Sequence, residues 1–276
     1  MRSVAFLGPA GTFTEEALLA SAEDEVEAIP YATVYETVMA VQDGHVEGAV
    51  VPIENSIEGS VHATLDALAG EARDVRIARE VVRPVQHCLI AARQLEPAQV
   101  ERVLSHPQAL AQCARFLRER LPGAERASAP STADAVRIVA EHGGEWGALA
   151  PRLAAELYDC RVLLEGVEDE SGNSTRFVWL APANADPEPG AAKTSIVFWG
   201  FNDDSPGALV AVLGEFAERE INLTKIESRP LRGRLGHYMF FADLEGGIEA
   251  PEVENALEGL RSRVEQLRVL GSYPVD

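Results

Sequence analysis

A short polar segment, ESGNSTRF (170–177), offers side chains that could bind and transform an anion. Asn173 and Thr175 supply an amide and a hydroxyl, and Arg176 supplies a guanidinium whose planar fork matches the two oxygens of a carboxylate. The segment runs directly into the apolar stretch 177–180, which is typical of a buried strand. Because a rigid strand would hold the polar side chains in place, we expect a binding or catalytic site here.

A second polar segment, GPAGTFTEE (8–16), lies between an expected strand and an expected helix. Gly8 and Gly11 allow close approach of the backbone at a helix N-terminus, where an anion such as a carboxylate binds well. The segment lacks the glycine spacing of a dinucleotide-binding motif. Thr12 and Glu15 also fit a capping box, so this segment has a purely structural alternative.

A third segment, VPIENSIEGSV (51–61), follows an expected buried strand and precedes an expected helix. Ligands of open α/β sheets bind at the carboxyl ends of the strands, which is where this loop would lie. The candidate ligand residues are Asn55 and Ser56, with Glu54 and Ser60 beside them. The alternative is a polar loop with ordinary helix capping.

A fourth segment, SHPQALAQC (105–113), has the same layout. Gln108 and Gln112 are four residues apart and therefore share one face of the expected helix. Two amides and an imidazole at a helix start suit a polar ligand, although a histidine such as His106 more often caps or packs. The candidate site residues here are Ser105, His106, Gln108 and Gln112.

Several other functions are excluded by composition and spacing. The histidines His45, His62, His87, His142 and His237 are isolated, so we predict no metal site. The three cysteines are far apart and form no CxxC pair, which predicts reduced thiols in a cytoplasmic protein. The formal net charge of −20 argues against nucleic acid and anionic membranes as partners. An anionic substrate would have to be bound by local arginines, helix N-termini and neutral donors.

The chain divides by pattern into two folded parts. Strand-like and helix-like segments alternate through residues 1–181, which predicts an α/β fold with mostly parallel sheet. Residues 182–192, with three prolines, read as a linker. Residues 193–276 follow the order βαββαβ of a ferredoxin-like domain, in which Ser205 is the expected N-cap of the first helix. Within the first part, helices are expected at 13–22, 33–43, 60–69, 107–120, 131–142 and 151–157, and strands at 4–8, 48–53, 85–91, 102–105, 147–150, 161–165 and 176–181.

Taken together, the four polar segments resemble the prephenate dehydratase family in their order, spacing and residue identities. The second part resembles an ACT regulatory domain, with GALV (207–210) and ESRP (227–230) at the positions of that family's phenylalanine-binding motifs. The resemblance covers the chain apart from the linker. It implies a two-lobed α/β catalytic domain like that of periplasmic binding proteins, with the site in the cleft between the lobes. It also implies the conversion of prephenate into phenylpyruvate, CO2 and water, which needs no cofactor because aromatisation drives it.

The resemblance assigns roles to the residues of the polar segments. Thr175 would donate a hydrogen bond to the departing hydroxyl, because the pKa of a threonine hydroxyl is far too high for a general acid. Arg176 would clamp a carboxylate, and Asn55 and His106 would complete the catalytic group. Water or His106 would supply the proton, and the sequence leaves that choice open. The residues implied to line the cleft are Thr12, Ser56, Ser105, Gln108, Gln112, Asn173 and Phe177.

The ACT half implies feedback inhibition by phenylalanine. The implied effector residues are Gly207, Ala208, Leu209, Asn222, Leu223, Glu227, Ser228 and Arg229, of which the last three would lie between two ACT domains. A homodimer or homotetramer is therefore expected. The alternative for the GAL segment is that it only lets a helix and a strand pack closely.

Two rival functions stay open at this point. An arogenate dehydratase performs the same chemistry on a substrate that differs by one ammonium group. A non-catalytic two-lobed sensor of a small molecule, with an attached ACT domain, would explain the donors and the cleft. It would not explain why a Thr–Arg pair lies where the two lobes join.

Overall fold

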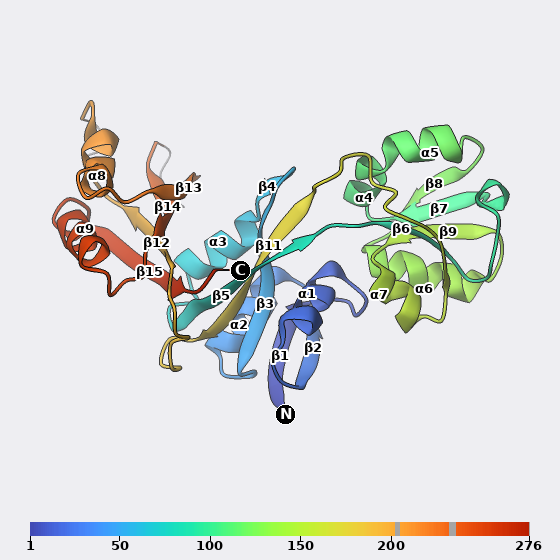
Figure 1. Cartoon of the computed structure of the whole chain (residues 1–276), viewed down its shortest axis with the longest axis horizontal. Helices are drawn as coiled ribbons and strands as arrows, with labels where there is room; N and C mark the ends of the chain where they lie inside the picture. The colour runs from blue at the N-terminus through green and yellow to red at the C-terminus, as the bar shows by residue number, and fades with distance from the viewer. Residues whose placement is uncertain (202–204, 232–235, 276) are drawn as a thin grey trace. The chain divides into compact units, whose positions relative to one another are not determined.

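A computed structural model of the chain describes residues 1–201, 205–231 and 236–275. The chain forms two compact units, each made from several segments. The first unit holds residues 1–37, 50–59 and 82–177, and the second holds residues 38–49, 60–81 and 178–276. The fold is mixed α/β with two mixed sheets, followed by an antiparallel sheet in the C-terminal part (Figure 1).

The first sheet has the strand order β2-β1-β3-β11-β5, with β4 paired to β3. Its strands are β1 (Arg2–Leu7), β2 (Val26–Tyr31), β3 (Gly48–Asn55), β4 (Gly59–Ser60), β5 (Val75–Pro84) and β11 (Ser174–Pro182). Its helices are α1 (Phe13–Ser21), α2 (Val34–Gln42) and α3 (His62–Ala69). Strands β3 and β11 are neighbours, so the polar residues at the end of β3 lie beside those at the start of β11.

The second sheet has the order β10-β6-β9-β7-β8. Its strands are β6 (Cys88–Ala91), β7 (Arg102–Ser105), β8 (Glu125–Ser128), β9 (Trp146–Ala150) and β10 (Arg161–Glu165), and a 3₁₀ turn covers Pro97–Gln99. Helices α4 (Pro107–Gln112) and α5 (Ala114–Arg120) cover one face, and α6 (Thr132–His142) and α7 (Arg152–Leu157) cover the other (Figure 1). Alternate residues of β6 enter two separate apolar cores, Cys88 and Ile90 on one side and Leu89 and Ala91 on the other.

Two crossover segments, residues 85–87 and 166–173, connect the first sheet with the second. They are hydrogen-bonded to each other: the Val85 amide donates to the Asn173 carbonyl at 2.8 Å, and the Val167 amide donates to the His87 carbonyl at 3.0 Å. The His87 amide also donates to the Glu168 carboxylate at 2.8 Å. These bonds fix the two crossovers, which carry several of the candidate site residues.

The C-terminal part, which is expected to be an ACT domain, forms a four-stranded antiparallel sheet in the order β13-β14-β12-β15. Its elements follow the predicted βαββαβ order: β12 (Lys193–Trp199), α8 (Ala208–Ala217), β13 (Leu223–Pro230), β14 (Tyr238–Glu245), α9 (Pro251–Arg261) and β15 (Gln266–Tyr273). Both helices pack through residues such as Phe216 and Leu257 on one face of the sheet. Residues 183–192, all of them described, contain neither helix nor strand.

The structure corrects four details of the sequence prediction. The sheets are mixed rather than mostly parallel, because β6 runs antiparallel to both of its neighbours. Strands β2, β5 and β8 were missed, since their charged residues break the apolar runs expected of buried strands. The expected helix 107–120 is interrupted at Cys113. Ser205 is not an N-cap: α8 is capped by Gly207 at φ 85, a left-handed conformation that glycine adopts without strain.

Cysteine chemistry and membrane crossing can be addressed directly. Cys88, Cys113 and Cys160 are free and buried. Burial raises the pKa of Cys88 to about 11 and also raises the pKa of Cys113, so both thiols stay protonated and unreactive near neutral pH. Among the described residues, no helix has the length and apolar content needed to cross a membrane.

Candidate functional site

Residues at the carboxyl end of β3 and around the start of β11 form an amide–hydroxyl cluster of Asn55, Ser56, Asn173 and Thr175, hereafter the amide cluster, in which Asn173 and Thr175 are buried. The Asn55 amide nitrogen donates to Asn173 Oδ1 and to Thr175 Oγ1, both at 2.9 Å. Asn55 Oδ1 accepts from the backbone amides of residues 57 and 58, both at 3.0 Å, which fixes the orientation of its side chain. Asn55 therefore holds both Asn173 and Thr175 in place.

The amide cluster keeps hydrogen-bonding capacity for a ligand. Asn173 is 4 % exposed, and its Nδ2 has no partner among the described residues. Thr175 is 8 % exposed and uses its oxygen as an acceptor for Asn55, which leaves its own hydrogen available to donate. Because an unsatisfied buried donor is costly, Asn173 Nδ2 favours a ligand that brings an acceptor atom to this position.

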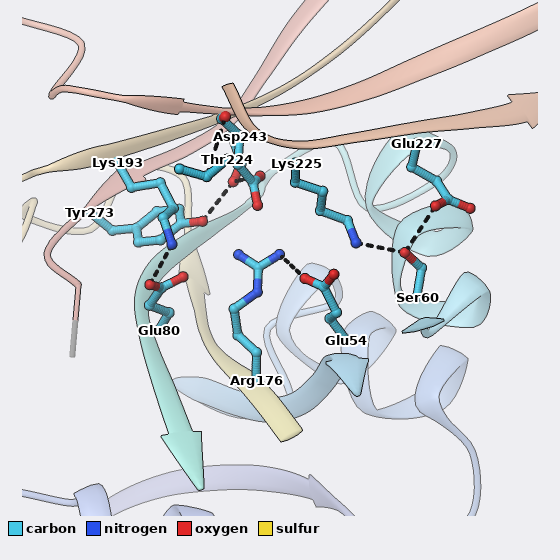
Figure 2. Close-up of polar contacts among 11 residues, drawn as sticks. Glu54, Ser60, Glu80, Arg176, Lys193, Thr224, Lys225, Glu227, Asp243 and Tyr273 are labelled. Carbon is cyan, nitrogen blue, oxygen red and sulfur yellow. Dashed lines mark hydrogen bonds and ion pairs between the residues drawn. The ribbon is translucent and has the colours of Figure 1, made fainter. Parts of the chain in front are cut away.

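Arg176 lies on the opposite face of β11 from Thr175, because successive residues of a strand point to opposite faces. Its guanidinium donates to Glu54 Oε2 at 2.9 Å, and its side chain is 11 % exposed (Figure 2). Glu54 precedes Asn55 and alternates with it in the same way. The structure therefore brings Asn55 together with Thr175, and Glu54 together with Arg176.

A second polar group joins the crossover to α4. His87 Nε2 lies 3.0 Å from Gln112 Oε1, and the imidazole makes an edge contact with the Phe13 ring at 5.2 Å between centroids. His87 is 2 % exposed, and its Nδ1 has no partner among the described residues. Burial lowers the pKa of His87, so the ring is neutral near pH 7. Sequence reasoning dismissed His87 because it stands alone in the sequence, and no spacing signal could have found it.

The other predicted site residues bond to nearby backbone, lie in the core or are exposed. Thr12 Oγ1 donates to the Leu7 carbonyl at 3.0 Å and accepts from the Glu15 amide, and Ser105 Oγ, fully buried, donates to the Leu149 carbonyl at 2.5 Å. His106 caps α4 by accepting from the Gln108 amide at 3.3 Å. Phe177 is buried in the core, and the side chain of Gln108 is exposed.

The loop before α1 packs on the second sheet's helices. A Cβ on Gly11, which has φ 86, would lie 3.2 Å from Ala154 Cα and 3.4 Å from Ala133 Cβ. Only glycine permits this approach, so the loop carrying Thr12 and Phe13 is held against α6 and α7.

The predicted effector residues fall into two groups. Gly207, Ala208 and Leu209 line a cavity of about 280 Å³ at the start of α8, together with Phe201, Ser205, Val210, Gly236, Tyr238 and Phe240. Asn222 pairs with Glu245, and Leu223 packs into the ACT core.

The side chains of Glu227 and Arg229 on β13 contact Ser60 and helix α3. Glu227 accepts from Ser60 Oγ at 3.1 Å and lies 3.2 Å from His62, while Arg229 pairs with Asp66 at 2.7 Å. Lys225 donates to the same Ser60 at 2.6 Å (Figure 2). Ser228, between them, points to the exposed side of the strand.

Comparison with known proteins identifies the family. The model of the prephenate dehydratase family matches residues 4–185, and the model of the ACT domain matches residues 201–262. The chain belongs to the prephenate dehydratase family. The resemblance read from the polar segments is thereby confirmed, together with the enzyme class, a hydro-lyase of phenylalanine biosynthesis, and the ACT domain.

Individual relatives agree over nearly the whole chain. Prephenate dehydratase of Mycobacterium tuberculosis strain H37Rv is 40% identical over 284 residues, covering 99% of this chain and 87% of its own. The crystal structure of prephenate dehydratase from Arthrobacter aurescens, in complex with L-Phe, has a TM-score of 0.89 and 38% identity and covers 98% of this chain and 89% of its own. A structure described as a novel type of quorum quenching acylase has a TM-score of 0.87 and 34% identity and covers 100% of this chain and 98% of its own.

Proposed function

We propose that this prephenate dehydratase converts prephenate into phenylpyruvate, CO2 and water at the amide cluster. One observation carries the proposal: Asn173 Nδ2 and the Thr175 hydroxyl are buried donors with capacity left for a ligand. Prephenate is a dianion with a ketone, so it is rich in acceptors that match these donors. In a buried site, such donors act more strongly than they would in water.

The chemistry defines what the donors must do. Departure of the ring carboxylate as CO2 supplies the electron pair that aromatises the ring, and the hydroxyl leaves at the opposite carbon. The dianion becomes the monoanion phenylpyruvate, so one proton is consumed and water is released. Thr175 donates to the oxygen of the departing hydroxyl and stabilises the charge that develops there, which for a single preorganised donor is worth about 2.7–4 kcal/mol.

Asn55 acts as a positioning residue in this proposal. Its oxygen is held by two backbone amides, and its nitrogen holds Asn173 Oδ1 and Thr175 Oγ1. Rotation of Thr175 away from the substrate would break one of these bonds. The proton that forms water comes from solvent or from His106, whose Nδ1 accepts from the Gln108 amide in the free protein.

Arg176 as the clamp for a substrate carboxylate stays a prediction. Its ion pair with Glu54 on the other face of β11 supports a second role, that of fixing β11 against β3. Of the remaining proposed lining residues, Ser56 contacts Asn173 within the amide cluster, whereas Ser105 bonds to the Leu149 carbonyl and Gln112 to His87.

The activity test uses both substrates of this chemistry. Purified protein is mixed with prephenate or with arogenate, and formation of phenylpyruvate or phenylalanine is followed, with Thr175→Ala beside the wild type. Turnover of prephenate supports the proposal, and preferential turnover of arogenate would make the chain an arogenate dehydratase. Turnover of neither would favour a non-catalytic sensor or the acylase activity described for one solved relative.

Phenylalanine is the proposed effector, and the cavity at the start of α8 is its proposed site. The L-Phe complex of the Arthrobacter aurescens relative supports this assignment. The contacts of Lys225 and Glu227 with Ser60 offer a route for coupling, because Ser60 is only five residues from Asn55 along the chain. If phenylalanine weakens substrate binding, prephenate must weaken phenylalanine binding by the same factor.

The effector proposal is tested by titrating the rate with phenylalanine. Gly207→Ala should raise the concentration of phenylalanine that gives half inhibition, because alanine is strained at φ 85. Each variant's rate without phenylalanine is its own reference. Wild-type sensitivity in Gly207→Ala would argue against this cavity. A homodimer or homotetramer and a cytoplasmic location remain predictions, and sedimentation of the purified chain tests the first.

A further inference from the structure

Two buried polar atoms of the crossover segments have no hydrogen-bond partner among the described residues. Outside the arginines, His87 Nδ1 and Asn173 Nδ2 are the only fully buried side-chain nitrogens or oxygens without a hydrogen-bond partner in the described part of the chain. Asn173 already belongs to the amide cluster. His87 does not, and the reaction outlined above gives it no role.

The crossover geometry brings His87 and Asn173 to the same face. The Val85 amide donates to the Asn173 carbonyl, so these two residues lie opposite each other. Residues 85, 86 and 87 alternate between buried, exposed and buried, as expected of an extended segment. His87, two residues after Val85, bonds to Val167 and Glu168 of the same crossover segment, so both His87 and Asn173 belong to one hydrogen-bonded pair of segments. Thr175, two residues beyond Asn173, lies on that face as well.

The hydrogen bond to Gln112 decides what His87 Nδ1 can offer. Gln112 Oε1 is an acceptor, so the Nε2 atom that lies 3.0 Å from it carries the hydrogen. In a neutral imidazole, Nδ1 then has a lone pair and can only accept. Prephenate has two carboxylates, a ketone and one hydroxyl, and the hydroxyl is its only hydrogen-bond donor.

We propose that His87 is a substrate-contacting residue whose Nδ1 accepts the hydrogen bond of the ring hydroxyl of prephenate. The proposal rests on the function proposed above. In this proposal the ring hydroxyl of prephenate lies over Asn173. His87 contacts it from one side and Thr175 from the other. With its hydrogen held by His87, the hydroxyl directs its lone pairs toward Thr175 and Asn173, whose donors stabilise its departure. Phe13 and Gln112 fix the imidazole in the required orientation.

Two substitutions separate this role from mere support of Gln112. In His87→Asn, the amide oxygen takes the place of Nδ1 and the contact with Gln112 is lost. In His87→Gln, the longer amide reaches Gln112 and the acceptor at the Nδ1 position is lost. We expect His87→Gln to lower kcat/KM for prephenate about 10–100-fold, since one hydrogen bond to the reacting group is removed, and His87→Asn to stay within about fivefold of wild type. The reverse order, or wild-type rates in both, would overturn the proposal.

Inhibition by the product decides the remaining case, in which both variants lose activity. Phenylpyruvate lacks the hydroxyl, so its inhibition constant should stay within about twofold of wild type in both variants. A parallel loss of phenylpyruvate inhibition would mean that the ring only shapes the site, and the proposal would fail. Thermal unfolding and phenylalanine inhibition of the same samples report whether the variants are folded. A wild-type protein without prephenate turnover would sink the proposed function itself, whereas turnover with a fully active His87→Gln sinks only the role of His87.

Discussion

Two faces of the same strand pair, β3 and β11, differ in how their polar groups are satisfied. On one face, Asn55, Asn173 and Thr175 form a neutral cluster with donors to spare. On the other, Glu54 and Arg176 form a charged pair. The charged residues look more like a catalytic pair in the sequence, but on the neutral face Asn173 Nδ2 is a buried donor without a partner among the described residues.

The difference has a physical origin. The Arg176 side chain is only 11 % exposed, so its guanidinium must find partners, and Glu54, whose side chain is 37 % exposed, supplies one of them. An amide or a hydroxyl can be buried with one hydrogen bond unmade at a cost of about 1–3 kcal/mol, which a bound ligand restores.

Thr175→Ala should give the largest effect and tests the neutral face directly. Loss of one preorganised donor to a developing charge lowers kcat about 10²–10³-fold. The measurement is the initial rate of phenylpyruvate formation at saturating prephenate. Thr175→Ser, which keeps the hydroxyl, is the matched control and should retain most of the rate. Equal loss in both variants would point to the methyl group's packing instead of the hydroxyl.

Asn55→Asp should give the second-largest loss of activity, smaller than that of Thr175→Ala. The carboxylate keeps the two backbone hydrogen bonds at residues 57 and 58, but it cannot donate to Asn173 Oδ1 and Thr175 Oγ1. We expect kcat/KM to fall about 10–100-fold, since each contact of this kind contributes about 0.5–1.5 kcal/mol and one acceptor becomes a repulsive neighbour. Asn55→Ala, which also loses the backbone bonds, should unfold at a lower urea concentration than Asn55→Asp. An Asn55→Asp enzyme with wild-type kcat/KM would contradict the positioning role.

The sequence predicted the contents of the neutral face but not its separation from the charged one. The motif NSTR puts Thr175 and Arg176 side by side, and the resemblance gave both a role in catalysis. Only the strand register, in which neighbours point apart, shows that they serve different faces. The strand was expected to begin at residue 176, whereas β11 begins at Ser174. With the earlier start, the alternation of side chains would have predicted that Thr175 and Arg176 lie on opposite faces.

Other parts were beyond the reach of a single sequence. His87 and Asn173 are 86 positions apart, and only the crossover hydrogen bonds make them neighbours. Strand β5 carries Arg76, Arg79 and Arg83 among its apolar residues, and Arg76 bonds to the distant carbonyls of Ala185 and Asp186. Periodicity identifies elements well where one face is apolar, and it fails where long-range polar contacts cover the other face.

The charged face is tested by Glu54→Gln and Arg176→Ala. If Arg176 mainly fixes β11 against β3, both variants should lower the free energy of unfolding by about 1–3 kcal/mol and change the Michaelis constant for prephenate only a few-fold. Urea unfolding and steady-state kinetics on the same samples provide the comparison. If Arg176→Ala instead raises the Michaelis constant for prephenate by about two orders of magnitude, and Glu54→Gln leaves it near the wild-type value, Arg176 binds a substrate carboxylate.

The pH dependence of stability should show the smallest effect. It tests the protonation state of the His87 imidazole. Burial lowers the pKa of His87 below its ordinary value of about 6.5. Above pH 6.5 or so, the ring is neutral in the folded and the unfolded chain and contributes no pH dependence. As the pH falls below that value, the unfolded chain binds the proton first, so stability is lost until the folded pKa is reached. The contribution is at most about 1.4 kcal/mol per pH unit, and it should be absent from His87→Gln. Urea unfolding of both proteins between pH 7.5 and 5 gives the difference, in which the nearby carboxylates such as Glu168 cancel because both proteins carry them. Identical slopes would mean that the imidazole can be protonated in the folded protein, and Nδ1 would then be a donor, which is incompatible with accepting the hydroxyl's hydrogen bond.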